Sequence, residues 1–275
     1  MTSRAPGGPL AGSAEVLTCA VDFARQALAV ADAELHKLFR DPTELFTRSV
    51  QPILWLLVFG QVFTRTHAIP TGGLTYLDFM APGVLAQSIL FTSIFFGIAI
   101  IWERDLGILQ KTLVTPAYRG ALVLGKGLSA GVRALAQSAL VVVVTLVLGV
   151  RLRAAPLPWL GVVVAVLFGA AAFSTFSLVV ACLVKTRERF MGIGQVLTMP
   201  LFFASNAIYP IDLMPGWLRV VARLNPLTYL VDGLRALMVE GAASAFGLGT
   251  DLAVQAGVLV LLVALAARLY PTVAV

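Results

Sequence analysis

Two glycine-rich runs near the middle of the chain have the spacing of motifs that carry chemistry. The run from Gly120 to Lys126 reads GALVLGK and matches the start of a phosphate-binding loop, whose backbone N–H groups cradle phosphates. That motif needs Ser or Thr next to hold Mg²⁺, and Gly127 stands there instead. No alternation of strand and helix patterns surrounds the run. The sequence therefore predicts no nucleotide site in this chain.

The second run, from Gly127 to Gly131, reads GLSAG and has the spacing of a hydrolase nucleophile elbow. An elbow requires a strand-to-helix turn with a histidine nearby, and the two histidines, His36 and His67, belong to distant segments. No group of histidine, cysteine and acidic residues has metal-ligand spacing. We therefore expect no catalytic residue and no metal site, and we interpret the glycines as points of close helix approach in a membrane.

Composition places the elements around these runs in a membrane. Of the 275 residues, 59% are hydrophobic and only 12% are charged, whereas soluble domains average about 25% charged residues. This balance excludes a cytosolic enzyme, a disordered chain and a basic nucleic-acid binder, so no nucleic-acid partner is expected. The net charge of +6 is then best interpreted through the distribution of lysine and arginine between the two sides of the membrane. Cys19 and Cys182 lie in apolar contexts and suggest no disulfide framework.

Charge-free apolar runs predict an all-α membrane protein with six transmembrane helices, because a span needs about 20 apolar residues. The predicted spans are Ser49–Thr64, Phe79–Ile101, Ala134–Val150, Ala154–Val184, Phe190–Ile211 and Leu252–Ala267. Fourteen of the 20 lysines and arginines fall on the side that holds both termini, which predicts cytoplasmic termini. Within the predicted spans, charge is limited to Arg133 near one end.

The N-terminal segment is predicted to lie on the membrane surface. Residues 1–13 are rich in glycine and proline and are expected to be flexible. Residues 14–41 alternate apolar and polar faces at helical spacing and end in a basic region, which is typical of an amphipathic surface helix. A soluble helix packed elsewhere is the alternative. Residues 42–275 form the predicted six-span domain.

The connection between the second and third spans is long and highly charged. Leu106, Leu109 and Leu113 recur at helical spacing until Thr115-Pro116, so a short amphipathic helix is expected here. An apolar stripe on a charged cytoplasmic helix favours docking against a partner protein. The alternative is an inert connector, but connectors are commonly shorter and need no such stripe.

The connection between the fifth and sixth spans contains two predicted helices that are too short to cross a membrane. They run from about 215 to 224 and from about 227 to 239, and Asn225-Pro226 supplies a cap and first turn for the second. Trp217 and Tyr229 suit a membrane interface. We interpret the pair as helices that enter the outer leaflet and turn back. An amphipathic surface loop is the alternative.

These two connections resemble those of the type-2 ABC exporter permeases, closest to the drug- and lipid-export branch around daunorubicin-resistance permeases. The resemblance covers roughly Ala31 to Met238. In the first connection it rests on Glu103, Arg104, Gly107, Leu109, Leu113, Thr115, Pro116, Arg119, Gly125 and Lys126. In the second it rests on Asn206, Tyr209, Pro210, Met214, Pro215, Trp217, Leu218, Asn225, Pro226 and Tyr229.

The resemblance implies a multi-pass subunit of a bacterial cytoplasmic membrane that exports an amphiphilic drug, natural product or lipid by alternating access. It implies a separate ATP-binding subunit in two copies, docked on the Glu103–Arg119 segment, and a second permease chain, either identical or a paralogue. ATP and Mg would bind the ATPase, and this chain would hold no cofactor and catalyse no reaction. Membrane lipid would surround the spans, and the motif from Asn206 to Tyr229 would cap the outer end of the pathway.

The resemblance also makes Gln87, Phe91, Phe95 and Phe202 candidates for lining the pathway, because it places the second and fifth spans at the central cavity. Aromatic rings with a few amides suit an amphiphilic solute. Export of a polysaccharide or lipid-linked glycan is an alternative. A secondary transporter and an intramembrane enzyme are less favoured, because each needs ionisable groups within its spans.

Overall fold

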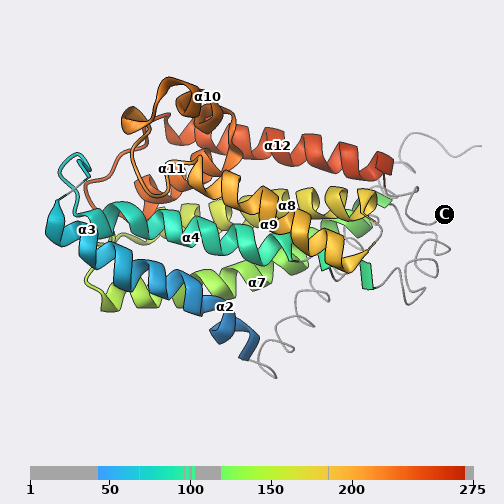
Figure 1. Cartoon of the computed structure of the whole chain (residues 1–275), viewed down its shortest axis with the longest axis horizontal. Coiled ribbons are helices and arrows are strands. Elements are labelled where there is room, and N and C mark those ends of the chain that lie inside the picture. The colour runs from blue at the N-terminus through green and yellow to red at the C-terminus, as the bar shows by residue number, and fades with distance from the viewer. Residues whose placement is uncertain are drawn as a thin grey trace, which may run out of the picture.

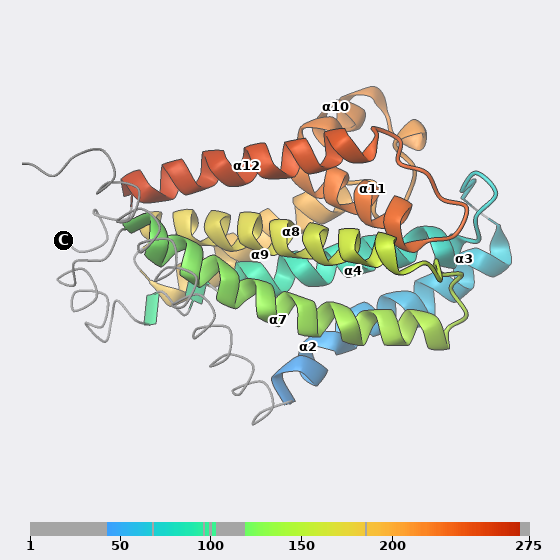
Figure 2. The same cartoon turned by 180° about the vertical axis from the view of Figure 1, so that it is seen from behind.

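A computed structural model describes residues 43–67, 69–95, 97–98, 101–102, 119–184 and 186–269. This part of the chain is a bundle of long helices lying side by side, with two short helices at one end (Figures 1 and 2). It contains no strand, only an isolated antiparallel bridge between Leu152 and Val239. The predicted surface helix at 14–41 and the docking residues from Glu103 to Pro116 lie outside the described residues.

Four described helices are long and apolar enough to cross a membrane. They are α4 (Tyr76–Ile94), the Ala130–Val147 part of α7 (Arg119–Val147), α8 (Pro156–Leu183) and α12 (Leu248–Leu269). Helix α4 is apolar on all sides and is buried along most of its length, with α7, α8 and α11 packed around it. It begins at Thr75, whose side chain accepts a hydrogen bond from the Asp78 N–H at 3.1 Å.

The glycine-rich runs both lie in α7. The backbone is helical from Arg119 onward, so neither run forms the loop or the strand-to-helix turn that its motif requires. The predicted third span begins at Ala134, directly after Arg133, whereas α7 begins at Arg119. The described helix simply continues through Lys126 and Arg133.

The predicted first span corresponds to one continuous helical segment with a wide turn inside it. It consists of α2 (Thr43–Leu54), the π-helix η1 (Trp55–Gly60) and α3 (Gln61–Thr66). Pro52 cannot donate a backbone hydrogen bond, and the wide turn follows directly after it. The aromatic rings stack along this segment, with Trp55 4.5 Å from Phe59 and Phe59 6.2 Å from Phe63.

The predicted fifth span corresponds to α9 (Arg187–Phe203), which ends eight residues earlier than predicted because side chains cap its last carbonyls. Ser205 Oγ donates to the Phe202 carbonyl at 2.7 Å, and Tyr209 Oη donates to the Phe203 carbonyl at 2.6 Å. These bonds satisfy groups that helix continuation would otherwise have to pair. The chain then passes through η2 (Ile211–Leu213).

Two short helices follow, within one residue of their predicted bounds. They are α10 (Gly216–Leu224) and α11 (Pro226–Met238). Asn225 joins them: its Oδ1 accepts from the Leu227 N–H at 3.0 Å, and its Nδ2 donates to the Leu201 carbonyl at 2.6 Å. The residue therefore caps α11 and ties it to the end of α9.

Candidate functional site

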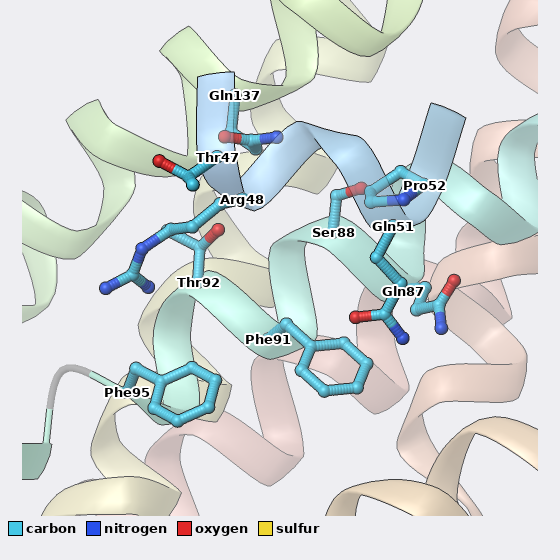
Figure 3. Close-up of a pocket in the computed structure, with 10 residues that line it drawn as sticks. All are labelled: Thr47, Arg48, Gln51, Pro52, Gln87, Ser88, Phe91, Thr92, Phe95 and Gln137. Carbon is cyan, nitrogen blue, oxygen red and sulfur yellow. The ribbon is translucent and has the colours of Figure 1, made fainter. Parts of the chain in front are cut away.

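A cavity of about 310 Å³ lies between α2, α4 and α7 (Figure 3). We call it the α2–α4 pocket. Its lining consists of Thr47, Arg48, Gln51 and Pro52 from α2, Gln87, Ser88, Phe91 and Thr92 from α4, the α4 C-cap residue Phe95, and Gln137 from α7. The α4 residues recur at three- and four-residue intervals, so one face of that helix forms the floor of the pocket.

Aromatic and cationic groups meet at one end of the pocket. The rings of Phe91 and Phe95 are stacked with centroids 6.5 Å apart. The guanidinium of Arg48 lies 5.5 Å from the Phe95 ring centroid, which is within the range of a cation–π contact. Figure 3 shows both rings below the α2 side chains, on the opposite wall of the pocket. This end can hold the apolar body of a ligand.

Amides supply the polar part of the lining. Gln137 donates through Nε2 to Ser49 Oγ at 2.7 Å, which joins α7 to α2. The Oε1 atoms of Gln87 and Gln137 are both buried, and neither has a hydrogen-bond partner among the described residues. Buried acceptors of this kind are normally paired, so they favour a ligand that carries donor groups.

The structure therefore brings together three of the four predicted lining residues. Gln87, Phe91 and Phe95 share the pocket, whereas Phe202 is not part of its lining. Phe202 is 1% exposed and packs against Trp55 and Phe203, with ring centroids 5.9 Å and 5.4 Å away. Sequence reasoning missed Gln137, although an amide inside an otherwise apolar run is a signal that could have singled it out.

The loops beyond the end of α3, away from the α2–α4 pocket, form a second polar region, which we call the loop end. It comprises residues 69–75, 148–155, 204–215 and 239–247, which converge at one end of the bundle (Figure 1). A cavity of about 780 Å³ lies there, and its lining includes Asn206, Pro210, Asp212, Asp232 and Arg235. The loop end therefore contains part of the predicted outer motif.

Arg235 holds the loop end together from inside α11. Its Nε donates to the Phe79 carbonyl at 3.2 Å, and its Nη2 donates to the Asn206 carbonyl at 2.7 Å. Its guanidinium also lies 3.8 Å from the Phe79 ring centroid, and Nη1 is 4.0 Å from Asp232 Oδ1. Burial lowers the pKa of Arg235 to about 10, and Asp232 opposes this shift. The guanidinium stays protonated at neutral pH.

A second ion pair joins α4 to the segment between α7 and α8. Asp78 accepts from the Arg151 side chain at 3.0 Å and from the Arg151 backbone N–H at 3.0 Å. The adjacent Arg153 donates to the Val239 and Ala242 carbonyls at 3.1 Å and 2.8 Å. These contacts fix two of the four loop segments, 148–155 and 239–247, relative to each other and to the first turn of α4.

Two carboxylates lie just outside the predicted spans that begin at Phe79 and Leu252. Asp78 lies in the first turn of α4, and Asp251 lies in the first turn of α12. Both helices begin earlier than the apolar runs that predicted them, because a carboxylate is favourable in the first turn of a helix. Both carboxylates lie at the loop end and not in the middle of a helix.

The remaining residues of the outer motif serve different parts of this end. Met214 is buried, and Pro215 is the N-cap residue of α10. Trp217 is 70% exposed on α10. Tyr229 Oη donates to the Arg223 carbonyl at 2.7 Å.

The candidate docking segment begins beside the first residue of α9. Trp102 directly precedes it, and the guanidinium of Arg187, the first residue of α9, lies 3.8 Å from the Trp102 ring centroid. Arg119 is the first residue of α7. Of the predicted docking residues, only Arg119 belongs to the described backbone.

Comparison with known proteins connects this helical bundle to transporters. The model of the ABC-2 type transporter family matches residues 25–239. The transport permease ycf38 of Cyanophora paradoxa is 31% identical over 73% of this chain and 70% of its own length. The daunorubicin resistance ABC transporter permease protein DrrB1 of Streptomyces coeruleorubidus is 27% identical over 95% of this chain and 94% of its own.

A third relative has a similar name. The doxorubicin resistance ABC transporter permease protein DrrC of Mycobacterium tuberculosis is 25% identical over 80% of this chain and 79% of its own length. The resemblance drawn from the two connecting segments is confirmed by these matches. The extent of the family match shows that this chain belongs to the ABC-2 type transporter family and is a membrane permease.

Proposed function

We propose that this permease exports an amphiphilic solute, such as a drug, natural product or lipid, across the cytoplasmic membrane by alternating access. The α2–α4 pocket carries this proposal, because it combines stacked phenylalanines, a cation and unpaired amide oxygens in a cavity of about 310 Å³. Two relatives are named for resistance to daunorubicin and doxorubicin, which are polycyclic amphiphiles. The pocket chemistry and these names agree on the solute class.

The test uses the chain reconstituted in vesicles with its ATP-binding subunit. Phe91→Ala and Gln87→Leu should each lower ATPase stimulation by amphiphilic solutes at least severalfold. Leu160→Ala, at an exposed apolar position of α8, is the control and should behave as wild type. Unchanged stimulation in both pocket variants would contradict the proposal. So would stimulation by a lipid-linked glycan but by no amphiphile.

Energy would come from a partner ATP-binding subunit, a role that follows from the family. Two copies of that subunit would bind ATP and Mg, close on each other and move the docked loops of two permease chains, identical or paralogous. This differential contact would shift the permease between inward- and outward-open states. The Glu103–Arg119 segment is our candidate for the docking site.

Two substitutions test the docking segment. Glu103→Ala removes a carboxylate that can pair with cations of the partner, and Gly107→Leu removes a backbone that permits close approach. Both variants should reach the membrane at wild-type levels but lose solute-stimulated ATPase activity. Wild-type coupling in both would rule out this segment as the docking site.

The topology that we propose has six spans, in a bacterial cytoplasmic membrane. The α2–η1–α3 segment and α9 would add two spans to the four long helices, and both termini would be cytoplasmic. Residues 14–41 would lie on the inner surface, and 42–275 would form the permease domain. Helices α10 and α11 would enter the outer leaflet. This arrangement places the loop end outside and the Glu103–Arg119 segment inside.

Thiol labelling tests this orientation in a background that lacks Cys19 and Cys182. Gly216→Cys suits the purpose because no atom lies within 4 Å of an added Cβ. It should react with an impermeant thiol reagent added from outside, whereas Ala117→Cys should react only after permeabilisation. The reverse pattern would invert the topology and remove the docking assignment with it.

A further inference from the structure

One hydroxyl at the loop end lies between two carboxylates. Ser244 Oγ is 2.8 Å from Asp232 Oδ2 and 2.8 Å from Asp251 Oδ2. The same oxygen accepts a hydrogen bond from the Gly247 N–H at 2.7 Å. Asp232 belongs to α11 and Asp251 to α12, so Ser244 bridges the two helices within the segment that connects them.

The single hydroxyl proton of Ser244 is not enough to form hydrogen bonds to two ionised carboxylates. A serine hydroxyl has one proton to donate and two lone pairs that accept. It can therefore donate to one carboxylate only. The second oxygen, at 2.8 Å, requires a proton of its own on the carboxyl group. One of the two aspartates must be a neutral acid.

The surroundings decide which aspartate is neutral. Asp232 Oδ2 accepts from Ser244 and also from the Ala245 and Phe246 N–H groups at 2.7 Å and 3.2 Å. Its Oδ1 lies 4.0 Å from the Arg235 guanidinium. Three donors and a cation therefore pair the Asp232 carboxyl group without a proton of its own.

Asp251 has less of this support: Ser244 is its one side-chain hydrogen-bond partner among the described residues, and the first turn of α12 favours a negative charge only modestly. Asp251 is 2% exposed, and its Oδ1 is buried without a hydrogen-bond partner among the described residues. A buried carboxylate oxygen without a donor carries a large desolvation cost. If Asp251 is protonated, its O–H donates to Ser244 Oγ, Ser244 donates to Asp232, and the hydroxyl is fully paired.

Other charged groups around Asp251 do not change this assignment. Arg235 on α11 is already committed to Asp232 and two carbonyls, and Arg153 is bonded to the Val239 and Ala242 carbonyls. Helix α8, which packs against α12, has no acidic or basic residue. The cations of α7 are Arg119, Lys126 and Arg133, and none lies beyond the midpoint of that helix. Helix α7 begins at the end of the bundle where α12 ends, whereas Asp251 is in the first turn of α12 (Figure 2).

We propose that Asp251 is a proton-binding site and that loss of its proton to solvent loosens the connection between α11 and α12. The ionised form would place two negative charges on either side of one hydroxyl, with a single proton between them. The folded chain therefore binds a proton that an unfolded aspartate releases above about pH 4. Because the folded state binds more protons, stability falls as the pH rises above that value.

Thermal unfolding of the full chain in detergent, measured from pH 5 to 8.5, tests the proposal. Asp251→Asn keeps a neutral donor to Ser244 but cannot titrate, so it should lose the part of the pH dependence that Asp251 causes. Relative to this variant, wild type should melt progressively earlier as the pH rises. Asp212→Asn is the matched control, since that exposed carboxylate at the same end should leave the wild-type pH dependence intact. An Asp251→Asn curve parallel to wild type would overturn the proposal.

Hydrogen exchange provides a measurement on the wild-type chain itself, should Asp251→Asn fail to fold. The N–H groups of Ala245, Phe246 and Gly247 are bonded to this bridge. After correction for intrinsic rates, their protection should fall as the pH rises. Protection that stays constant from pH 5 to 8.5 would show that no proton controls the bridge.

Discussion

The α2–α4 pocket and the loop end both bury polar side chains, but they differ in how far these are paired. The loop end leaves Asn206 Oδ1 and Asp251 Oδ1 without partners, yet its buried charged groups Asp78 and Arg235 are paired. At the loop end, Arg235 reaches two carbonyls and a carboxylate, and Asp78 receives three hydrogen bonds from Arg151. In the pocket, the carbonyl oxygens of Gln87 and Gln137 are buried without partners. Satisfied groups fix a structure, whereas unsatisfied ones are available to a ligand. The contrast separates a framework from a binding surface.

The largest expected effect is the loss of the central cation of the framework. Arg235→Met would leave the Phe79 and Asn206 carbonyls without their donor and Asp232 without its cation. Removing one partner of a buried ion pair costs about 3–5 kcal/mol. Denaturant unfolding of the purified chain measures this loss. Arg223→Met, at an exposed position, is the control and should change stability by less than about 0.5 kcal/mol. Equal effects of the two variants would mean that Arg235 is not a framework residue.

A smaller loss of stability is expected at Gly83, where α4 lies close to the backbone of Ala207. A Cβ added at Gly83 would lie 2.4 Å from the Ala207 carbonyl oxygen, and a backbone atom cannot move aside cheaply. Gly83→Ala should therefore destabilise the chain by about 1–3 kcal/mol, as overpacking does. Gly192→Ala is the opposite case, because nothing lies within 4 Å and the position is helical. It should stabilise by about 0.5–1 kcal/mol in the same unfolding experiment.

The smallest change in unfolding free energy is expected in the pocket. This substitution tests the difference between the pocket and the loop end most directly. Gln87→Leu removes an acceptor that has no partner, so the unfolding free energy should change by less than about 0.5 kcal/mol. The same variant should lower the stimulation of ATPase activity by amphiphilic solutes. Gln255→Leu is the matched amide in the framework, where Nε2 donates to the Pro226 carbonyl at 2.6 Å. It should cost about 0.5–1.5 kcal/mol. If Gln87→Leu were the more destabilising of the two, the pocket would belong to the framework.

Local signals in the sequence predicted much of the fold. The Asn225-Pro226 pair marks the boundary between α10 and α11, because a side-chain cap and a fixed φ act within a few residues. Apolar runs located the long helices for the same reason. Their ends were less predictable: α9 stops at Phe203 because Tyr209 and Ser205 fold back onto it, and this depends on the path of the following loop.

The candidate site was predictable only in part. Gln87, Phe91 and Phe95 share a helix face, so their proximity follows from helical spacing. Phe202 has the same chemistry, but its position depends on Trp55, more than a hundred residues away in the chain. The bridge of Asp232, Ser244 and Asp251 likewise depends on how α11 and α12 pack. Spacing in one sequence does not contain such information.

The wide turn Trp55–Gly60 in the first helical segment determines how the side chains after it are rotated about the helix axis. An α-helix advances about 100° per residue, so closing the wide turn into regular α-helix would swing every later side chain by about that angle. Phe63 now packs edge-on against Tyr76, with centroids 5.1 Å apart, and Leu77 lies against Gly60. Such a swing would turn this aromatic column away from α4 while leaving the part of α2 before Trp55 where it is. The wide turn thus sets the rotational phase of the second half of this helix, and with it the side chains that face α4.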